Sequence, residues 1–364
     1  MSCTLKDLSP SHTRDSLASI DLEVSSKDAH GTWSASSATA ARIGGRLELV
    51  IAIVCPGQGS QTPGMLTPWL ELPGLADLLT GLSAAADLDL SAHGKTSDED
   101  TIKDTAIAQP LLVASGLLSW RALMSDLDQG VNVSPDTILA GHSVGEITAA
   151  ALTGVLTEAE AMSFVALRGR GMAEAASVTP TGMSAVLGGD QDEVLATIAA
   201  AGLTPANVNG AGQIVAAGTL DQLAAFAEAP PARARVIPLK VAGAFHTSHM
   251  GSAVEALASR ADSLEASDPA YTLLSNRDGE AVSDGPKVLE RLVAQVSSPV
   301  RWDLCMDTMA ASGVTGLIEL LPGGTLAGLA KRALKGIEIV ALKTPDDLPA
   351  ARDLLTRHAG RDNA

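Results

Sequence analysis

Short apolar runs alternate with longer helical segments along most of the chain. Residues 47–55 form a nearly continuous apolar run that ends at Pro56, a pattern typical of a buried strand leading into a loop. Residues 106–125 and 146–176 have the length and composition of helices, and residues 137–140 between them indicate a second strand. Strands that alternate with helices in this way predict an α/β fold with a mainly parallel sheet.

The stretch between residues 181 and 243 has a different rhythm. Its predicted order is strand, helix, strand, strand, helix, strand, which is the split βαβ pattern of ferredoxin-like domains. The six elements are expected at 182–188, 190–201, 206–209, 213–218, 220–228 and 235–241. We therefore expect a small ferredoxin-like domain at 181–243, inserted into a large domain made of 47–180 and 244–350.

The two ends of the chain lack this patterning. Residues 1–46 are rich in Ser, Thr, Ala and Asp and have no sustained apolar pattern, so we expect a disordered extension. Residues 351–364 are predicted to form a charged C-terminal tail. Acidic and basic residues are equal in number within 1–46, so the net charge of the chain belongs to the remaining residues.

The charge balance excludes several classes of protein. Acidic residues outnumber basic ones by 42 to 25 among 364 residues, a net charge of -17. A protein this acidic is poorly suited to a phosphate backbone or an anionic membrane, so we expect neither nucleic acid nor membrane as a partner. The longest apolar run, 105–120, is too short to span a bilayer and contains Gln109 and Pro110.

Cysteine usage indicates a reducing compartment. Cys3, Cys55 and Cys305 lie far apart, so neither a disulfide framework nor a zinc site is indicated. The N-terminus carries charged residues and no apolar segment typical of a secretory signal. We therefore expect a cytoplasmic protein.

The most specific local motif is G-x-S-x-G at residues 141–145, between a predicted strand and a predicted helix. Small residues on both sides allow a sharp turn, which would present Ser143 at a helix N-terminus where backbone N–H groups can hold an oxyanion. The pentapeptide alone is also common in a glycine-rich chain. It makes Ser143 a candidate nucleophile.

Among seven histidines, His246 is the candidate base for this serine, because it follows the predicted end of a strand. His142 adjoins Ser143, but a neighbouring residue on such a turn is expected to point elsewhere. The spacing of His246 and His249 also resembles a metal pair, yet no carboxylate or cysteine stands nearby at ligand spacing, so we expect no metal.

Two further segments carry candidate chemistry. The glycine-rich loop at 56–61 lacks the patterns of nucleotide-binding loops, and its backbone can instead supply half of an oxyanion hole. Arg168 lies in a largely apolar predicted helix, where arginine is rarely buried without an anionic partner. It either pairs with a structural carboxylate or reaches solvent, or it presents its fork to a substrate carboxylate.

Together these motifs resemble the malonyl-CoA:acyl-carrier-protein transacylase family of fatty acid synthesis and the related acyltransferase domains of polyketide synthases. The matching segments run in family order from about residue 50 to 345. They are PGQGSQ at 56–61, GHSVGE at 141–146, RG at 168–169, NVNGAGQ at 207–213, AFHT at 244–247, QVSSPVRW at 295–302 and PGGTL at 322–326.

The resemblance implies a large α/β-hydrolase-like domain with a ferredoxin-like insertion, and it implies a role for each matching residue. Ser143 would be the nucleophile and His246 its base. Backbone N–H groups of Gln58 and Val144 would form the oxyanion hole. Arg168 would bind the malonyl carboxylate, the backbone near Gln295 would orient the histidine, and Asn209 and Phe245 would lie near the substrate.

The reaction implied by the resemblance is a ping-pong transfer of malonyl from malonyl-CoA, through a malonyl-serine ester, to the phosphopantetheine thiol of an acyl carrier protein. The enzyme itself would need no cofactor, and we expect a monomer. The bulk of Phe245 implies a preference for malonyl over methylmalonyl. Carrier proteins are acidic, so we expect a local basic docking patch, unless its candidates are ordinary solvated charges. The candidates are Arg277, Arg301, Lys331, Arg332 and Lys335.

Three alternatives remain open from the sequence. A serine hydrolase or thioesterase shares the serine turn and the histidine, but would not require Arg168 and should show a triad acid. A non-catalytic module that binds carrier protein would not need Ser143 and His246. A malonyl-transferring subunit of another complex, such as malonate decarboxylase, would have similar residues.

Overall fold

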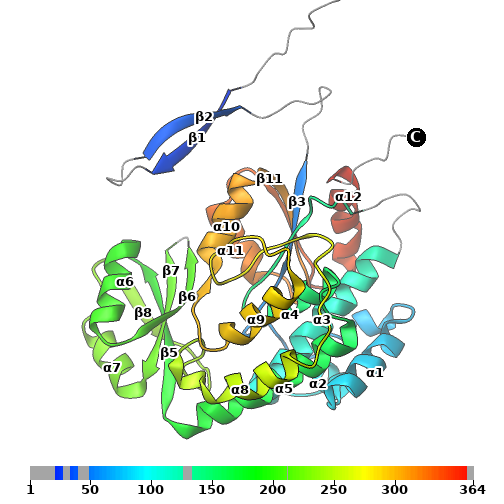
Figure 1. Ribbon diagram of the computed structural model, residues 1–364, viewed down its shortest axis with the longest axis horizontal. Coiled ribbons are helices and arrows are strands. Elements are labelled where there is room, and N and C mark those ends of the chain that lie inside the picture. The colour runs from blue at the N-terminus through cyan, green and yellow to red at the C-terminus, as the bar shows by residue number, and fades with distance from the viewer. Residues whose placement is uncertain (1–20, 28–32, 40–48, 126–132, 211, 359–364) are drawn as a thin grey trace, which may run out of the picture. The chain divides into compact units, whose positions relative to one another are not determined.

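The computed structural model describes residues 21–27, 33–39, 49–125, 133–210 and 212–358 (Figure 1). The chain divides into two compact units, Met1–Glu48 and Leu49–Ala364. In the first unit, β1 (Asp21–Lys27) pairs antiparallel with β2 (Trp33–Thr39). The disordered extension expected at 1–46 stays a prediction, and the rest of that stretch lies outside the described residues.

A five-stranded parallel sheet forms the centre of the larger unit, as the alternation of strands and helices predicts. Its order is β12 (Glu338–Ala341), β11 (Val314–Glu319), β3 (Val50–Cys55), β4 (Ile138–Gly141) and β9 (Thr272–Leu273). The central position of β3 explains its continuous apolar sequence, because a parallel strand covered on both faces has no solvent-facing side.

Helices cover both faces of this sheet. They are α1 (Leu75–Ala86), α2 (Leu90–Lys95), α3 (Thr105–Ser125), α4 (Gly145–Leu152), α5 (Glu158–Val178), α8 (Ser252–Ala261), α9 (Gly285–Gln295), α10 (Trp302–Ala311), α11 (Thr325–Ala333) and α12 (Leu348–His358). Successive side chains of β3 point to opposite faces. Ile51, Ile53 and Cys55 join a cluster with α1, α3, α4 and α5, whereas Ala52 and Val54 pack with α10 and α11.

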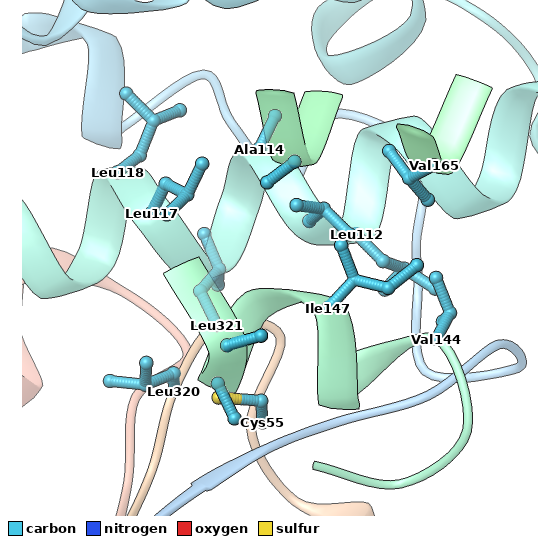
Figure 2. Packing of buried hydrophobic residues seen from close by; sticks show 14 of the residues in the cluster. Cys55, Leu112, Ala114, Leu117, Leu118, Val144, Ile147, Val165, Leu320 and Leu321 are labelled. Atoms are coloured by element: carbon cyan, nitrogen blue, oxygen red, sulfur yellow. The ribbon is translucent and has the colours of Figure 1, made fainter. Parts of the chain in front are cut away.

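The helix α3 lies in the larger of these clusters. Figure 2 shows part of it, in which Leu112 and Leu117 of α3 lie with Ile147 of α4 and Cys55 of β3. By length and composition α3 is the one described helix that could cross a membrane, but 78% of its most apolar window is buried inside the fold. Its 21 residues extend beyond the apolar run seen in the sequence.

Two sequence predictions need correction. The single helix expected at 146–176 is two helices, α4 and α5, because Gly154 adopts a φ of 81° and Thr157 with Glu160 forms a capping box that starts a new helix. The C-terminal tail expected from residue 351 is helix α12 as far as His358, and its Leu354 is fully buried. An amphipathic helix end was thus mistaken for a charged tail.

A second sheet has the order β10-β6-β7-β5-β8. Its elements are β5 (Thr181–Gly188), α6 (Gln191–Ala200), β6 (Thr204–Gly210), β7 (Gln213–Thr219), α7 (Leu220–Glu228), β8 (Ala234–Pro238) and β10 (Val300–Arg301). Strands β5 to β8 pair antiparallel in the neighbour order of a ferredoxin-like sheet, and Figure 1 shows them gathered with α6 and α7 on one side of the larger unit. The short β10, which the sequence did not predict in this sheet, adds parallel to β6.

Candidate active site

Ser143 lies on a sharp turn between β4 and α4, as the motif predicts. Its φ is 54°, in the left-handed region that a residue other than glycine rarely adopts. The flanking glycines make this turn possible: a Cβ on Gly141 would overlap the backbone of Gly145, and a Cβ on Gly145 would overlap the carbonyl oxygen of Cys55. The chain can therefore turn tightly enough to expose the serine hydroxyl only with small residues at both positions.

His246 lies next to this hydroxyl, 103 residues further along the chain. Ser143 Oγ and His246 Nε2 are 2.7 Å apart, and His246 Nδ1 is 2.9 Å from the carbonyl oxygen of Gln295. Because that carbonyl can only accept, Nδ1 carries the ring proton and Nε2 is free to accept one from the serine. Burial, together with the charge of Arg168, lowers the pKa of His246 to about 3. The imidazole is therefore a neutral base at physiological pH.

Arg168 is the buried cation of the site, with 1% of its surface exposed. Its two terminal nitrogens donate to amide oxygens, Nη1 to Gln109 Oε1 at 2.7 Å and Nη2 to Gln295 Oε1 at 2.8 Å. Nη2 also lies 3.3 Å from Ser143 Oγ. Burial lowers the pKa of Arg168 to about 10, so the group keeps its charge.

No carboxylate forms an ion pair with Arg168 among the residues that the structure describes. Glu146 acts on it only at longer range, and the Nε atom of Arg168 is buried without a hydrogen-bond partner. The sequence left open whether Arg168 pairs with a structural carboxylate or reaches solvent, or whether it binds a substrate carboxylate. Among the described residues the first pairing is not observed, and the side chain does not reach solvent. A buried cation with neutral partners next to a nucleophile is suited to attract an anionic substrate group.

Two backbone amides lie at the carboxyl ends of neighbouring strands. Gln58 follows β3 and Val144 follows β4, and these strands pair in parallel at their ends, with Cys55 opposite Gly141. Within the described chain, neither the Gln58 nor the Val144 N–H donates a hydrogen bond. A Cβ on Gly57 would lie 2.6 Å from the carbonyl oxygen of His142, so the first loop approaches the serine turn closely.

The serine opens into a cavity of about 760 Å³, within the range of small-molecule sites. Both sheets contribute to its wall. The lining includes Gln58, Gln109, His142, Ser143, Asn209, Phe245, His246 and Leu326. Arg168 and Gln295 are not lining residues, and Arg168 meets the cavity wall through its contacts with Ser143 Oγ and Gln109 Oε1.

His142 also lines this cavity and connects it to the small sheet. Its Nε2 is 2.9 Å from Asn209 Oδ1, and Asn209 Nδ2 donates to Gln213 Oε1. The ring centroids of His142 and Trp302 are 5.8 Å apart. His142 therefore contacts the small sheet rather than assisting the serine, in agreement with the expectation that it points elsewhere.

The remaining candidates are dispersed. Arg301 forms a two-pronged pair with Asp303, and Arg277 is 4.0 Å from Glu290. Lys331 and Arg332 are exposed in the last turn of α11, whose first turns line the cavity. His249 is exposed, and no cluster of three potential metal ligands occurs among the described residues.

Three residues of the site were missed from the sequence. Gln109 accepts a hydrogen bond from Arg168. Asn276 holds the serine turn through its Oδ1, which accepts from Ser143 N at 2.7 Å. Glu146 in turn holds Asn276, because its Oε1 accepts from Asn276 N at 2.6 Å. Burial raises the pKa of Glu146 to about 8. The available signal was a polar residue within an apolar segment, which Gln109 provides in α3.

The lowered pKa of His246 predicts a pH-dependent contribution to stability. Unfolding returns the imidazole to its usual pKa near 6.5, so the unfolded chain takes up a proton first and the native protein loses stability as the pH falls below that value. A His246→Gln variant lacks this loss. Between pH 7 and pH 5.5, the free energy of unfolding measured in urea should fall on the order of 1 kcal/mol more in the wild type than in this variant. If the unfolding free energies of the two proteins depended on pH in the same way, that result would contradict a neutral buried histidine. The variant His249→Gln, at an exposed histidine, is the control.

Comparison with known proteins places this site in a family. The acyl transferase domain model matches residues 52–351. Two malonyl CoA-acyl carrier protein transacylases illustrate the similarity: that of Mycobacterium tuberculosis is 50% identical over 305 residues, 84% of this chain and 100% of the relative, and that of Escherichia coli is 32% identical over 311 residues, 83% and 99% of the two chains.

Solved structures agree with these relatives. The crystal structure of MCAT from Mycobacterium tuberculosis has a TM-score of 0.80 at 50% identity and covers 83% of this chain and 99% of that one. A type II PKS acyl-carrier protein in complex with its malonyl-transacylase has a TM-score of 0.77 at 29% identity, with 83% and 99% covered. This chain therefore belongs to the acyl transferase domain family, among the malonyl CoA-acyl carrier protein transacylases.

Proposed function

We propose that the protein transfers the malonyl group of malonyl-CoA to the phosphopantetheine thiol of an acyl carrier protein, supplying chain elongation in fatty acid or polyketide synthesis. One observation carries the proposal: Ser143 Oγ lies 2.7 Å from a neutral histidine and 3.3 Å from a buried arginine with which none of the described carboxylates pairs. The first contact activates a nucleophile, and the second provides a place for the free carboxylate of a malonyl group.

In the first half-reaction, His246 Nε2 takes the hydroxyl proton as Ser143 Oγ attacks the thioester carbonyl carbon. The backbone N–H groups of Gln58 and Val144 are free to donate to the resulting oxyanion. Collapse of this tetrahedral intermediate breaks the carbon–sulfur bond. CoA leaves as the thiol with the proton from His246, and a malonyl ester remains on the serine.

The second half-reaction reverses these steps with a different thiol. The phosphopantetheine thiol gives its proton to His246 as its sulfur attacks the ester carbonyl carbon. The carbon–oxygen bond to Ser143 then breaks, the serine recovers the proton, and malonyl-carrier protein leaves. Because pantetheine is part of both substrates, the enzyme needs no cofactor of its own.

A carbonyl oxygen orients the base of this site, where a hydrolase triad would use a carboxylate. The oxygen belongs to the backbone of Gln295, whose side-chain Oε1 also accepts a hydrogen bond from Arg168 Nη2. One residue thus positions both the proton acceptor and the proposed carboxylate clamp. The arrangement favours a serine–histidine pair that acts on a malonyl ester over a triad hydrolase.

Carrier protein must reach this cavity despite the acidity of both partners. Of the cations considered from the sequence, Lys331 and Arg332 lie closest in the chain to the cavity wall, since Leu326 and Leu329 of the same helix line it. We propose the exposed end of α11, with Lys335, as the docking patch, because opposite charges there would offset the overall repulsion. The protein would act as a monomer in the cytoplasm, where the buried free thiols of Cys55 and Cys305 suit a reducing environment.

Intact-protein mass spectrometry tests the proposed function. Incubation with malonyl-CoA should add one malonyl group to the wild type and none to Ser143→Ala, and later addition of holo-carrier protein should move the group to the carrier. Release of malonate alone would identify a hydrolase, and the absence of any adduct would identify a binding module. Charge reversal at Lys331 should slow the second step and leave the first unchanged.

Removing the arginine should change acyl selectivity. Arg168→Ala should lower kcat/KM for malonyl-CoA about tenfold to a hundredfold more than for acetyl-CoA, since only malonyl presents a carboxylate to the guanidinium. Measuring both donors with the same variant separates lost binding from general damage to the site. Equal losses for the two donors would overturn the assignment of Arg168 as the carboxylate clamp.

Phe245 should restrict the space around the α-carbon. Its side chain is 6% exposed and lines the cavity beside the histidine. In a competition between malonyl-CoA and methylmalonyl-CoA we expect a preference for malonyl of about tenfold to a hundredfold, as one added methyl group in a tight pocket costs about 1 to 3 kcal/mol. Phe245→Ser should narrow the ratio, and equal use of both donors by the wild type would refute the steric role.

A further inference from the structure

Asn276 is fully buried in the segment that follows β9, with 0% of its surface exposed. Its side-chain amide contacts the serine turn twice. Asn276 Oδ1 accepts from Ser143 N at 2.7 Å, and Asn276 Nδ2 donates to the carbonyl oxygen of Gly141 at 2.7 Å. The one amide group therefore bridges the residues on either side of His142.

These two bonds continue the hydrogen-bond ladder between β4 and β9. The strands pair in parallel with Ile138 opposite Thr272, and Leu274 N donates to Leu139 O at 2.9 Å. The next backbone amide in this register would be that of Asn276, which would donate to Gly141 O and accept from Ser143 N. The Asn276 side chain makes both of these bonds in place of the backbone.

The backbone of Asn276 is used elsewhere. Its N–H donates to Glu146 Oε1 at 2.6 Å, and its carbonyl oxygen accepts from Arg301 N at 2.8 Å. Glu146 lies in the first turn of α4, directly after the serine turn. Asn276 is thus bonded to the strand before the serine, to the serine itself and to the helix after it.

We propose that Asn276 is the positioning residue of the nucleophile. It holds Ser143 in its left-handed backbone conformation and determines which backbone N–H group of the serine turn is free to bind an oxyanion. The use of malonyl-CoA in the test of this role rests on the function proposed above. Commitment of the Ser143 N–H to Asn276 leaves the Val144 N–H as the free donor at this turn. Gln295 Nε2 also lies 3.4 Å from Asn276 Oδ1, which connects the serine turn to the residue that orients both His246 and Arg168.

The chemistry requires an asparagine at this position. A side-chain amide carries both an N–H donor and a carbonyl acceptor, and here these replace the N–H and C=O that the backbone of residue 276 would offer to Gly141 and Ser143. Ionised aspartate keeps the acceptor for Ser143 N but has no donor for Gly141 O. It would also place a negative charge beside the buried carboxyl of Glu146, in surroundings that include Arg168, Arg291 and the Cys305 thiol.

Labelling of the serine tests the positioning role without any acyl donor. A fluorophosphonate reagent reports the reactivity of Ser143, and mass spectrometry gives the labelling rate. Asn276→Ala should label about a hundredfold more slowly and lose kcat in malonyl transfer by a similar factor, because a displacement of about 1 Å costs this much. Its KM for malonyl-CoA should change less than about threefold, since Arg168 is retained.

A matched control separates positioning from general loss of stability. Ser119 is also fully buried and also joins two backbone groups, Gly116 O and Leu321 N, and neither of these hydrogen bonds involves the serine turn. Ser119→Ala should lower the melting temperature and leave the labelling rate within about twofold. Equal labelling by the wild type and folded Asn276→Ala would overturn the proposal. Normal labelling with no malonyl transfer by the wild type would instead overturn the proposed function.

The isosteric Asn276→Asp variant gives a second readout if the alanine variant does not fold. A protonated aspartic acid restores one donor and one acceptor, whereas the ionised form does not. The labelling rate of Asn276→Asp, divided by that of the wild type at the same pH, should therefore rise at least tenfold as the pH falls from 9 to 6. A labelling rate equal to that of the wild type at every pH from 6 to 9 would show that the amide donor to Gly141 has no part in positioning, and would overturn the proposal.

Discussion

The positive charge of Arg168 is buried beside the reactive serine, and within the described chain no carboxylate pairs with it. Burial of an ion costs several kcal/mol unless polar groups replace its water. Here two neutral glutamine oxygens do so, from Gln109 and Gln295. They solvate the guanidinium without neutralising it, so the site retains a charge that a substrate anion can satisfy.

This uncompensated charge also acts on the base. After burial itself, the nearby guanidinium is the main factor that lowers the pKa of His246. The same cation therefore keeps the imidazole unprotonated and, in the proposed function, selects for a carboxylate on the acyl group. Replacing either glutamine by glutamate would weaken both effects, which gives a physical reason for amides at these two positions.

Much of the site could be predicted because its chemistry is local in sequence. Ser143 stands in a glycine-flanked turn, His246 follows a strand-like segment, and Arg168 interrupts an apolar helix; the family resemblance then joined them. Asn276 could not be found in this way, and Gln109 offered only its polarity within an apolar segment, since each acts through a hydrogen bond to a residue more than 50 positions away. The fold class followed from periodicity, but β10 is two residues long and too short to leave a periodic signal.

That short strand links the two sheets. Val300 and Arg301 pair with β6 of the small sheet and lead at once into α10, which packs against the large one. His142 and Asn209 form a second tie across the cavity. The two sheets are therefore linked at two points around the cavity. A cavity bordered by linked walls suits an acyl group carried on a slender arm, as pantetheine is in the proposed reaction.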